Sequence, residues 1–180
     1  MKKTLLVNAS PHLKGSTDRA FNLVLEKWEK AEYIVLRDRK IIPCIGCQTC
    51  AKAESRGRCI FEDKDEVKAI FDSLAQREKL VFFSPIYFYH LPSLFKGFID
   101  RAQSFYMLNP AFLPVKKAKA VLLAGRPKGE KLFEGARLTL KYFLQIFGYE
   151  VEVLGLRGVD GPEDLDAHKE QEILDFVQSW

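Results

Sequence analysis

The residues best suited to chemistry near the start of the chain lie in one stretch, residues 8–17, with the sequence Asn-Ala-Ser-Pro-His-Leu-Lys-Gly-Ser-Thr. An apolar run precedes this stretch and a helical pattern follows it. A strand that turns into a helix presents unpaired backbone N–H groups and a partial positive charge, which favour a bound phosphate. Four side chains add hydroxyl or amino groups to this site: Ser10, Lys14, Ser16 and Thr17. The alternative is that Ser16 or Thr17 is only the N-cap of the helix.

The stretch differs from the common glycine-rich phosphate motifs. Its only glycine is Gly15, whereas the dinucleotide fingerprint G-x-G-x-x-G and the P-loop G-x-x-x-x-G-K-[ST] both require more. A loop rich in hydroxyls suits a terminal phosphomonoester better than a bridging pyrophosphate. His12 lies in the same loop and is a candidate phosphate contact, with a plain surface position as the alternative.

A second candidate loop, residues 84–92, carries three aromatic side chains, Tyr87, Phe88 and Tyr89. Aromatic side chains beside a phosphate site favour a flat, conjugated ligand that stacks on them. FMN, a mononucleotide with a flat ring, fits both loops. The alternative is that these aromatic side chains only pack the loop itself.

Four cysteines lie close together in the sequence. Cys44, Cys47 and Cys50 have C-x2-C-x2-C spacing, and eight residues separate Cys50 from Cys59. Compact spacing lets thiolates wrap a [4Fe–4S] cluster, whereas zinc usually takes two separated pairs. Two alternatives need no metal: thiols that brace the loop around a tight turn at Gly46, and thiols that take part in disulfide exchange.

Apolar runs typical of strands alternate with helical patterns along the chain. This alternation predicts an α/β fold, a parallel sheet with helices on both faces. Right-handed crossovers leave few topologies, and one is a five-stranded doubly wound sheet of order 2-1-3-4-5. The loops at 10–17, 84–92 and 125–129 then meet where the strand order reverses. We expect strands at 3–9, 33–37, 80–83, 120–124 and 150–156, helices at 16–30, 65–76, 93–107, 131–147 and 163–180, and a loop at 109–114.

The 180 residues favour a single domain over 1–180, because a chain of this length buries a substantial core. A net charge of +4 without a basic stripe argues against nucleic acid as a partner. The apolar run near the N-terminus is too short for a signal peptide, and no run approaches the roughly 18 apolar residues of a membrane helix. We therefore expect a cytoplasmic protein with no membrane partner, in which the cysteines stay reduced.

Four segments combine into a recognisable pattern: Asn-Ala-Ser-Pro-(x3)-Gly-Ser-Thr at 8–17, Pro-Cys-Ile-Gly-Cys-Gln-Thr-Cys at 43–50, Gly-Arg-Cys-Ile-Phe-Glu-Asp at 57–63, and Ser-Pro-Ile-Tyr-Phe through Leu-Phe-Lys-Gly-Phe-Ile-Asp-Arg at 84–101. Together they resemble the flavodoxin-like NAD(P)H-dependent FMN reductases, including their iron–sulfur flavoprotein branch. The resemblance implies a flavodoxin-like three-layer sandwich and a homo-oligomer, either a dimer or a tetramer. It implies a phosphate site at Ser10, Gly15, Ser16 and Thr17.

The same resemblance implies contacts to the flavin ring from a second group of residues: Pro85, Ile86, Tyr87 and Phe88. Gly125 and Arg126 would approach the flavin as a third segment, although Arg-Pro-Lys-Gly stands where the family often has small hydroxyl-rich residues. Arg126 and Lys128 are also candidates to receive the phosphates of a nicotinamide dinucleotide. The neighbouring Asp100 and Arg101 are expected to be a structural pair.

The leading hypothesis is an enzyme, an FMN-dependent oxidoreductase that takes hydride from NAD(P)H and passes electrons to a small acceptor such as a flavin or a quinone. No side chain is assigned as a catalytic acid or base, because the flavin carries the redox chemistry. One alternative is an iron–sulfur flavoprotein that carries electrons to a redox protein such as ferredoxin, with a [4Fe–4S] cluster on the four cysteines. Another is a flavodoxin-like binding module without catalysis.

Overall fold

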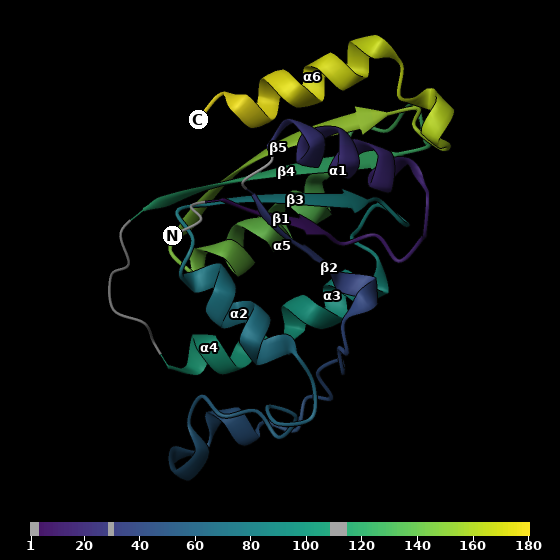
Figure 1. Cartoon of the computed structure of the whole chain (residues 1–180). Coiled ribbons are helices and arrows are strands. Elements are labelled where there is room, and N and C mark those ends of the chain that lie inside the picture. Colours follow the sequence, from purple (N-terminus) through teal and green to yellow (C-terminus); the bar gives the residue numbers. More distant parts are fainter. Residues whose placement is uncertain (1–3, 29–30, 109–114) are drawn as a thin grey trace.

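The computed structural model describes residues 4–28, 31–108 and 115–180. Five strands form one sheet in which every neighbouring pair is parallel. Their spatial order (Figure 1) is β2 (Glu32–Val35), β1 (Thr4–Asn8), β3 (Lys79–Pro85), β4 (Lys116–Ala124) and β5 (Tyr149–Arg157). The predicted order 2-1-3-4-5 is confirmed.

Helices cover both faces of the sheet and give the three layers (Figure 1). One face carries α1 (Ser16–Lys27) and α6 (Ala167–Gln178). The other carries α2 (Val67–Ala75), α3 (Ser93–Asp100), α4 (Gln103–Met107) and α5 (Glu134–Gln145). Because both faces are covered, the central strands are apolar on both sides, as their continuous runs of Leu, Val and Phe predict.

A separate core fills each side of the sheet. On the α1 and α6 side, Phe21 and Ile173 pack with strand residues that include Val81 and Phe83. The other side is rich in phenylalanine, with ring centroids 4.7 Å apart for Phe71 and Phe98 and similar contacts to further rings. The members of this aromatic cluster are Phe71, Phe82, Phe95, Phe98, Phe105, Phe143 and Phe147.

The helix expected at 93–107 is two helices, α3 and α4. The break lies at Arg101 and Ala102, whose N–H groups bond to carbonyls three residues earlier, at 3.2 and 2.9 Å. The guanidinium of Arg101 reaches away from its helix to Asp65 and to the carbonyl of Ile42. The chain therefore tightens where this side chain turns inward.

Two further boundaries differ from the prediction for local reasons. Strand β4 begins at Lys116, because the ammonium of Lys119 is buried against the end of α6, where it donates to the carbonyl and hydroxyl of Ser179 at 2.7 Å. Helix α6 begins only at Ala167, since the carboxylate of Asp166 caps it by accepting from the N–H of Lys169 at 2.9 Å. The expected loop at 109–114 lies outside the described residues.

Between η1 (Leu36–Asp38) and α2, the chain forms an irregular segment that contains all four cysteines. We call residues 39–64 the cysteine segment. It has two short 3-10 turns, η2 (Thr49–Ala51) and η3 (Ala53–Ser55), and it lies beneath α4, away from the sheet (Figure 1). Within the described ranges, no helix is both long and apolar enough to cross a membrane.

Candidate functional site

The β1–α1 loop, residues 9–15, leads from the carboxyl end of β1 into α1. Gly15 is the N-cap residue, and Ser16 and Thr17 are buried in the first turn. In the described part of the chain, no oxygen accepts the backbone N–H groups of Ser16 and Thr17. These two amides and the positive end of the α1 dipole are therefore available to an anion.

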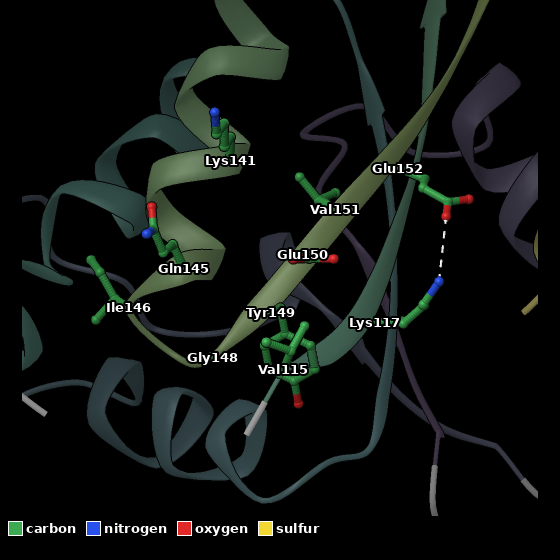
Figure 2. A pocket seen from close by; sticks show the side chains of 10 residues that line it. All are labelled: Val115, Lys117, Lys141, Gln145, Ile146, Gly148, Tyr149, Glu150, Val151 and Glu152. Atoms are coloured by element: carbon green, nitrogen blue, oxygen red, sulfur yellow. Dashed lines mark ion pairs between the residues drawn. The ribbon is translucent and has the colours of Figure 1, made fainter. Parts of the chain in front are cut away.

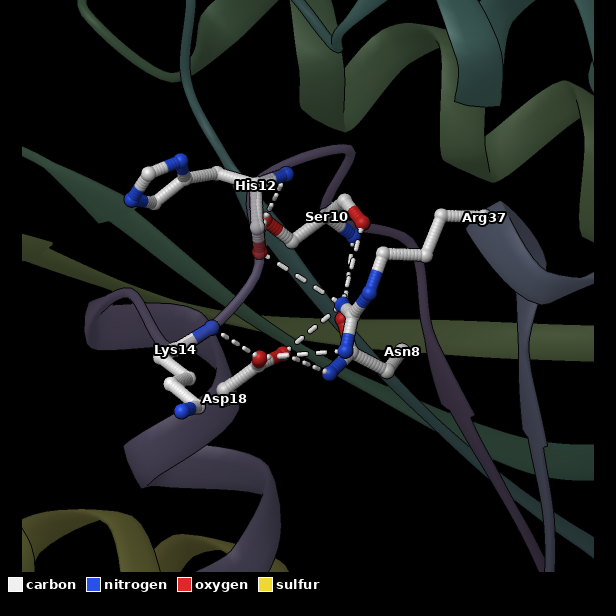
Figure 3. A network of polar contacts seen from close by, with 6 residues as sticks. All are labelled: Asn8, Ser10, His12, Lys14, Asp18 and Arg37. Atoms are coloured by element: carbon white, nitrogen blue, oxygen red, sulfur yellow. Dashed lines mark hydrogen bonds and ion pairs between the residues drawn. The ribbon is translucent and has the colours of Figure 1, made fainter.

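The carboxylate of Asp18, in the first turn of α1, holds this loop from beneath (Figure 3). Its Oδ1 accepts from Asn8 Nδ2 at 2.6 Å and from Arg37 at 2.8 Å. Its Oδ2 accepts from the N–H of Lys14 at 2.6 Å and from Arg37 at 3.0 Å. Four donors from three segments thus converge on one carboxylate, and the Arg37 guanidinium neutralises it.

The loop residues themselves are shaped by this network. Ser10 is buried, its N–H donates to Asn8 Oδ1 at 3.0 Å, and its hydroxyl is engaged with the backbone of His12 at 3.1–3.2 Å. Lys14 has a left-handed backbone with φ of 60°. A side chain on Gly15 would meet the His12 ring, since a Cβ there would stand 2.7 Å from its Cδ2. His12 and Lys14 are exposed, so their side chains face solvent.

The aromatic turn, residues 87–90, follows β3 at the same edge of the sheet. Tyr87 and His90 exchange two backbone hydrogen bonds, of 2.9 and 3.0 Å, and close a two-residue turn. The central residues Phe88 and Tyr89 are both left-handed, with φ of 48° and 64°. Bulky side chains rarely adopt this conformation, which costs about 1–3 kcal/mol each. Strain of this kind concentrates at functional sites, and the Phe88 side chain is fully exposed.

His90 fixes the aromatic turn against α5. Its Nδ1 accepts from the N–H of Leu91 at 2.9 Å, which leaves the proton on Nε2. Nε2 then donates to the hydroxyl of Thr139 at 3.1 Å. The ring is therefore held in one tautomer and braces the turn.

The loop after β4, residues 125–129, contacts the aromatic turn directly and the β1–α1 loop through the loop after β5. Arg126 lies over the Tyr89 ring, 5.4 Å from its centroid. A Cβ on Gly125 would stand 2.5 Å from the carboxylate of Asp160, in the loop after β5. The Asp160 carbonyl in turn accepts from the Ser16 hydroxyl at 3.2 Å. The three predicted loops thus form one continuous surface, with the β5 loop between two of them.

Four residues of this surface were not among the predicted site residues: Asn8, Asp18, Arg37 and Asp160. Asp160 follows β5, so the parallel topology alone would have placed it at this edge. Asp18 lies in the first turn of a helix, where acidic residues are common. For Arg37 the sequence holds no local sign of its contact with α1, which lies 19 positions away.

The four cysteines line one cavity of about 360 Å³, together with Met107 and Arg101. We call this the cysteine cavity. Cys44 and Cys47 are exposed, and Cys50 and Cys59 are partly buried. Among the described side chains, no group of three or more is arranged to hold a single metal ion.

The thiols differ in acidity. The hydroxyl and N–H of Thr49 hydrogen-bond to Cys47, and with the charge of Lys52 they lower its pKa. Burial raises the pKa of Cys50, and the neighbouring Cys59, Cys44 and Cys47 raise it further. The thiol of Cys47 therefore has more thiolate character than that of Cys50.

The cysteine segment is anchored by a buried ion pair. Arg101 donates to Asp65 at 2.5 Å, and both side chains are almost completely buried. Arg101 also donates to the carbonyl of Ile42 at 2.6 Å, and Asp65 accepts from the Ile42 N–H at 3.0 Å. Asp100, the sequence neighbour of Arg101, instead pairs with Lys96 on the surface of α3. The expected pairing of Asp100 with Arg101 is therefore wrong, because each side chain binds a different residue.

A larger cavity, of about 720 Å³, lies at the opposite end of the sheet, at the amino ends of β4 and β5 (Figure 2). Lys117 and Glu152, on the neighbouring strands β4 and β5, form an ion pair of 3.9 Å in its lining. Tyr149 is buried there, and its hydroxyl donates to the carbonyl of Leu74 at 2.8 Å. Ligands of open parallel sheets bind at the carboxyl ends of the strands, so this cavity is not the candidate site.

Comparison with known proteins agrees with this geometry. A family model described as flavodoxin-like fold matches residues 2–179. The chain belongs to this flavodoxin-like family. An iron–sulfur flavoprotein of Methanocaldococcus jannaschii is 30% identical over 106 residues, which are 56% of this chain and 52% of that protein. An iron–sulfur flavoprotein of Archaeoglobus fulgidus is 28% identical over 91% of this chain and 74% of its own length. The chain thus spans between half and three quarters of these two relatives.

Solved structures share the fold of this flavodoxin-like chain. An FMN-dependent NADH-azoreductase of Bacillus anthracis, crystallised in complex with FMN, has a TM-score of 0.69 and 16% identity, and the match covers 99% of this chain and 98% of that one. At this identity the likeness shows the fold. The predicted family and the predicted fold are therefore both confirmed.

Proposed function

We propose that the protein is an FMN-dependent oxidoreductase that takes hydride from NAD(P)H and passes electrons to a small acceptor. The observation that carries the proposal is the convergence, at one edge of the sheet, of the unpaired α1 amides with the strained aromatic turn. The named cofactor of the azoreductase that shares the fold supports it. When bound, FMN supplies the hydride and electron chemistry.

The residues present fit such a ligand. The N–H groups of Ser16 and Thr17 would bind its terminal phosphate, with the hydroxyl of Thr17 and the charge of Lys14 nearby. Within the described chain, no oxygen accepts the N–H groups of Phe88 and Tyr89, so these amides can bind the polar edge of a ring. Tyr87 and Phe88 would shield one side of the ring from water. Arg126, which is exposed, would meet the phosphates of the nicotinamide substrate.

The test is a titration of the protein with FMN, followed by flavin fluorescence, and an assay of NADH and NADPH oxidation with a free flavin or a quinone as acceptor. Removing a stacked ring typically costs about 0.5–1.5 kcal/mol, so Tyr87→Ala should weaken FMN binding about 2- to 10-fold. The control is Tyr142→Ala, which removes another exposed tyrosine, on α5. A protein that ignores FMN contradicts the proposal. A protein that binds FMN but oxidises neither nicotinamide is instead a binding module.

A second candidate function rests on the cysteine cavity. Four thiols around one cavity are the donor set that a [4Fe–4S] cluster requires, and the two relatives are named iron–sulfur flavoproteins. Cys44, Cys47, Cys50 and Cys59 would hold the cluster, and the protein would carry electrons to a redox partner such as ferredoxin. Anaerobic purification with iron and sulfide analysis tests this. About four of each per chain support it, and near-zero iron in protein never exposed to air contradicts it.

We further propose that the protein acts in the cytoplasm as a homo-oligomer on small molecules. The support is the fold shared with an azoreductase, whose named activity is on a small molecule. Light scattering on the eluted protein measures the mass directly. A mass equal to one chain of 20.7 kDa contradicts the oligomer.

A further inference from the structure

The ion pair of Asp18 and Arg37 places charge directly beneath the β1–α1 loop. We propose, on the basis of the proposed function, that this ion pair positions the β1–α1 loop and sets its ligand specificity. It holds the loop in the shape that binds a terminal phosphate, and so makes the site select a phosphorylated flavin over the same ring system without phosphate. Neither residue needs to touch the ligand for this role.

The ion pair sets the direction of the loop's backbone groups. Arg37 Nη1 donates to the carbonyl oxygens of Ser10 and His12, at 3.3 and 3.5 Å. Asp18 receives the N–H of Lys14, whose left-handed backbone turns the chain toward Gly15. Two carbonyls that would repel a phosphate are thus directed to a cation, while the Ser16 and Thr17 amides stay free.

The ion pair also controls the charge next to the phosphate site. A carboxylate in the first turn of α1 would repel a phosphate dianion at the same helix end if it stood alone. The guanidinium of Arg37 neutralises it through two bonds, of 2.8 and 3.0 Å, with both side chains largely buried. Removing only the arginine would leave an unpaired negative charge close to the phosphate. A ligand without phosphate would not sense that charge in the same way.

We therefore expect variants of the ion pair to weaken the binding of FMN more than that of riboflavin. Arg37→Met should weaken FMN binding about tenfold or more, the size of one or two hydrogen bonds to a charged group, and riboflavin binding by less than about twofold. Asp18→Asn keeps an acceptor for Lys14, so it should weaken FMN binding less. The double variant should bind FMN better than Arg37→Met alone, because the repelling carboxylate is gone.

The experiment is a calorimetric titration of the full chain and these variants with FMN and with riboflavin. The matched control is Arg19→Met, on the helix α1 that carries Asp18, because the guanidinium of Arg19 pairs with Glu170 instead of the loop. Circular dichroism reports whether each variant is folded. Arg37→Lys retains the charge without the two-bond geometry and serves if Arg37→Met does not fold. It should show an intermediate loss, again for FMN only.

The outcomes separate this inference from the proposed function. A selective loss of FMN affinity in folded Arg37 variants supports the positioning role. Equal losses for both ligands, or no loss, overturn it while leaving the proposed function standing. Wild-type protein that binds both flavins equally well also overturns it, and wild-type protein that binds neither removes the proposed function and this inference together.

Discussion

The β1–α1 loop and the cysteine segment are both irregular, both carry ligand-binding residue types, and yet they are held in different ways. The loop is saturated with internal polar bonds: Asp18 alone accepts from Asn8, Lys14 and Arg37. The cysteine segment is fixed where it meets α2, by the ion pair of Asp65 and Arg101, and it leaves two of its thiols exposed.

The difference indicates two strategies for a binding site. The loop is shaped before its ligand arrives, because the carbonyls of Ser10 and His12 and the carboxylate of Asp18 already have partners. Among the described residues, the amides of Ser16 and Thr17, at the start of α1, stay free. Preorganisation of this kind lowers the entropic cost of binding. In the cysteine segment, backbone turns shape the chain, but the thiols line a cavity and two of them are exposed. A group bound to these thiols would add to the rigidity of the segment.

The largest expected effect, on the free energy of unfolding, tests whether the cysteine segment depends on the Arg101–Asp65 ion pair. Arg101→Met leaves the Asp65 carboxylate buried without its cation, which should lower the free energy of unfolding by about 3–5 kcal/mol. Chemical denaturation measures this. The exposed Lys96–Asp100 pair on α3 is the control, and Lys96→Met should cost about 0.3–0.5 kcal/mol. A loss below about 1 kcal/mol for Arg101→Met would show that the segment is held by other contacts.

An intermediate effect tests whether the β1–α1 loop depends on its internal hydrogen bonds. Asn8 is buried and bridges Asp18 and the N–H of Ser10, so Asn8→Ala leaves a buried donor without its acceptor. We expect a loss of about 1–3 kcal/mol of unfolding free energy. Asn22→Ala, on the exposed side of α1, should stay within about 0.5 kcal/mol. Equal values for the two variants would mean that the loop does not rely on its polar network.

The smallest effect concerns the reactivity of the thiols in the cysteine cavity. The pKa of Cys47 is lowered and that of Cys50 is raised, so at neutral pH more of Cys47 is thiolate, the reactive form. In the metal-free protein, iodoacetamide should modify Cys47 before Cys50, and the difference should narrow as the pH rises toward the pKa of Cys50. Peptide mass spectrometry measures both rates.

Thr49→Val is the matched variant for this measurement, because it removes the hydroxyl that most lowers the Cys47 pKa. It should slow the modification of Cys47 at neutral pH and leave that of Cys50 nearly unchanged. Faster modification of Cys50 in the wild-type chain would contradict the assigned environments of the two thiols.

Much of this molecule could be predicted from local pattern. The apolar strands and amphipathic helices predicted five βα units, and right-handed crossovers then restricted the strand order. Errors arose where a charged residue enters the core. The three lysines at the start of β4 concealed four residues of strand, and the inward turn of Arg101 divided one expected helix into two.

The sequence by itself determined the fold and which loops share the carboxyl edge of the sheet, because hydrophobic period and crossover handedness are properties of consecutive residues. Only the tertiary structure decided which charged and polar groups meet. Arg37 with Asp18, Arg101 with Asp65, and Asp160 with Ser16 come from segments 19, 36 and 144 residues apart. A long side chain can reach many partners, and its choice depends on which of them the packed core has removed from water.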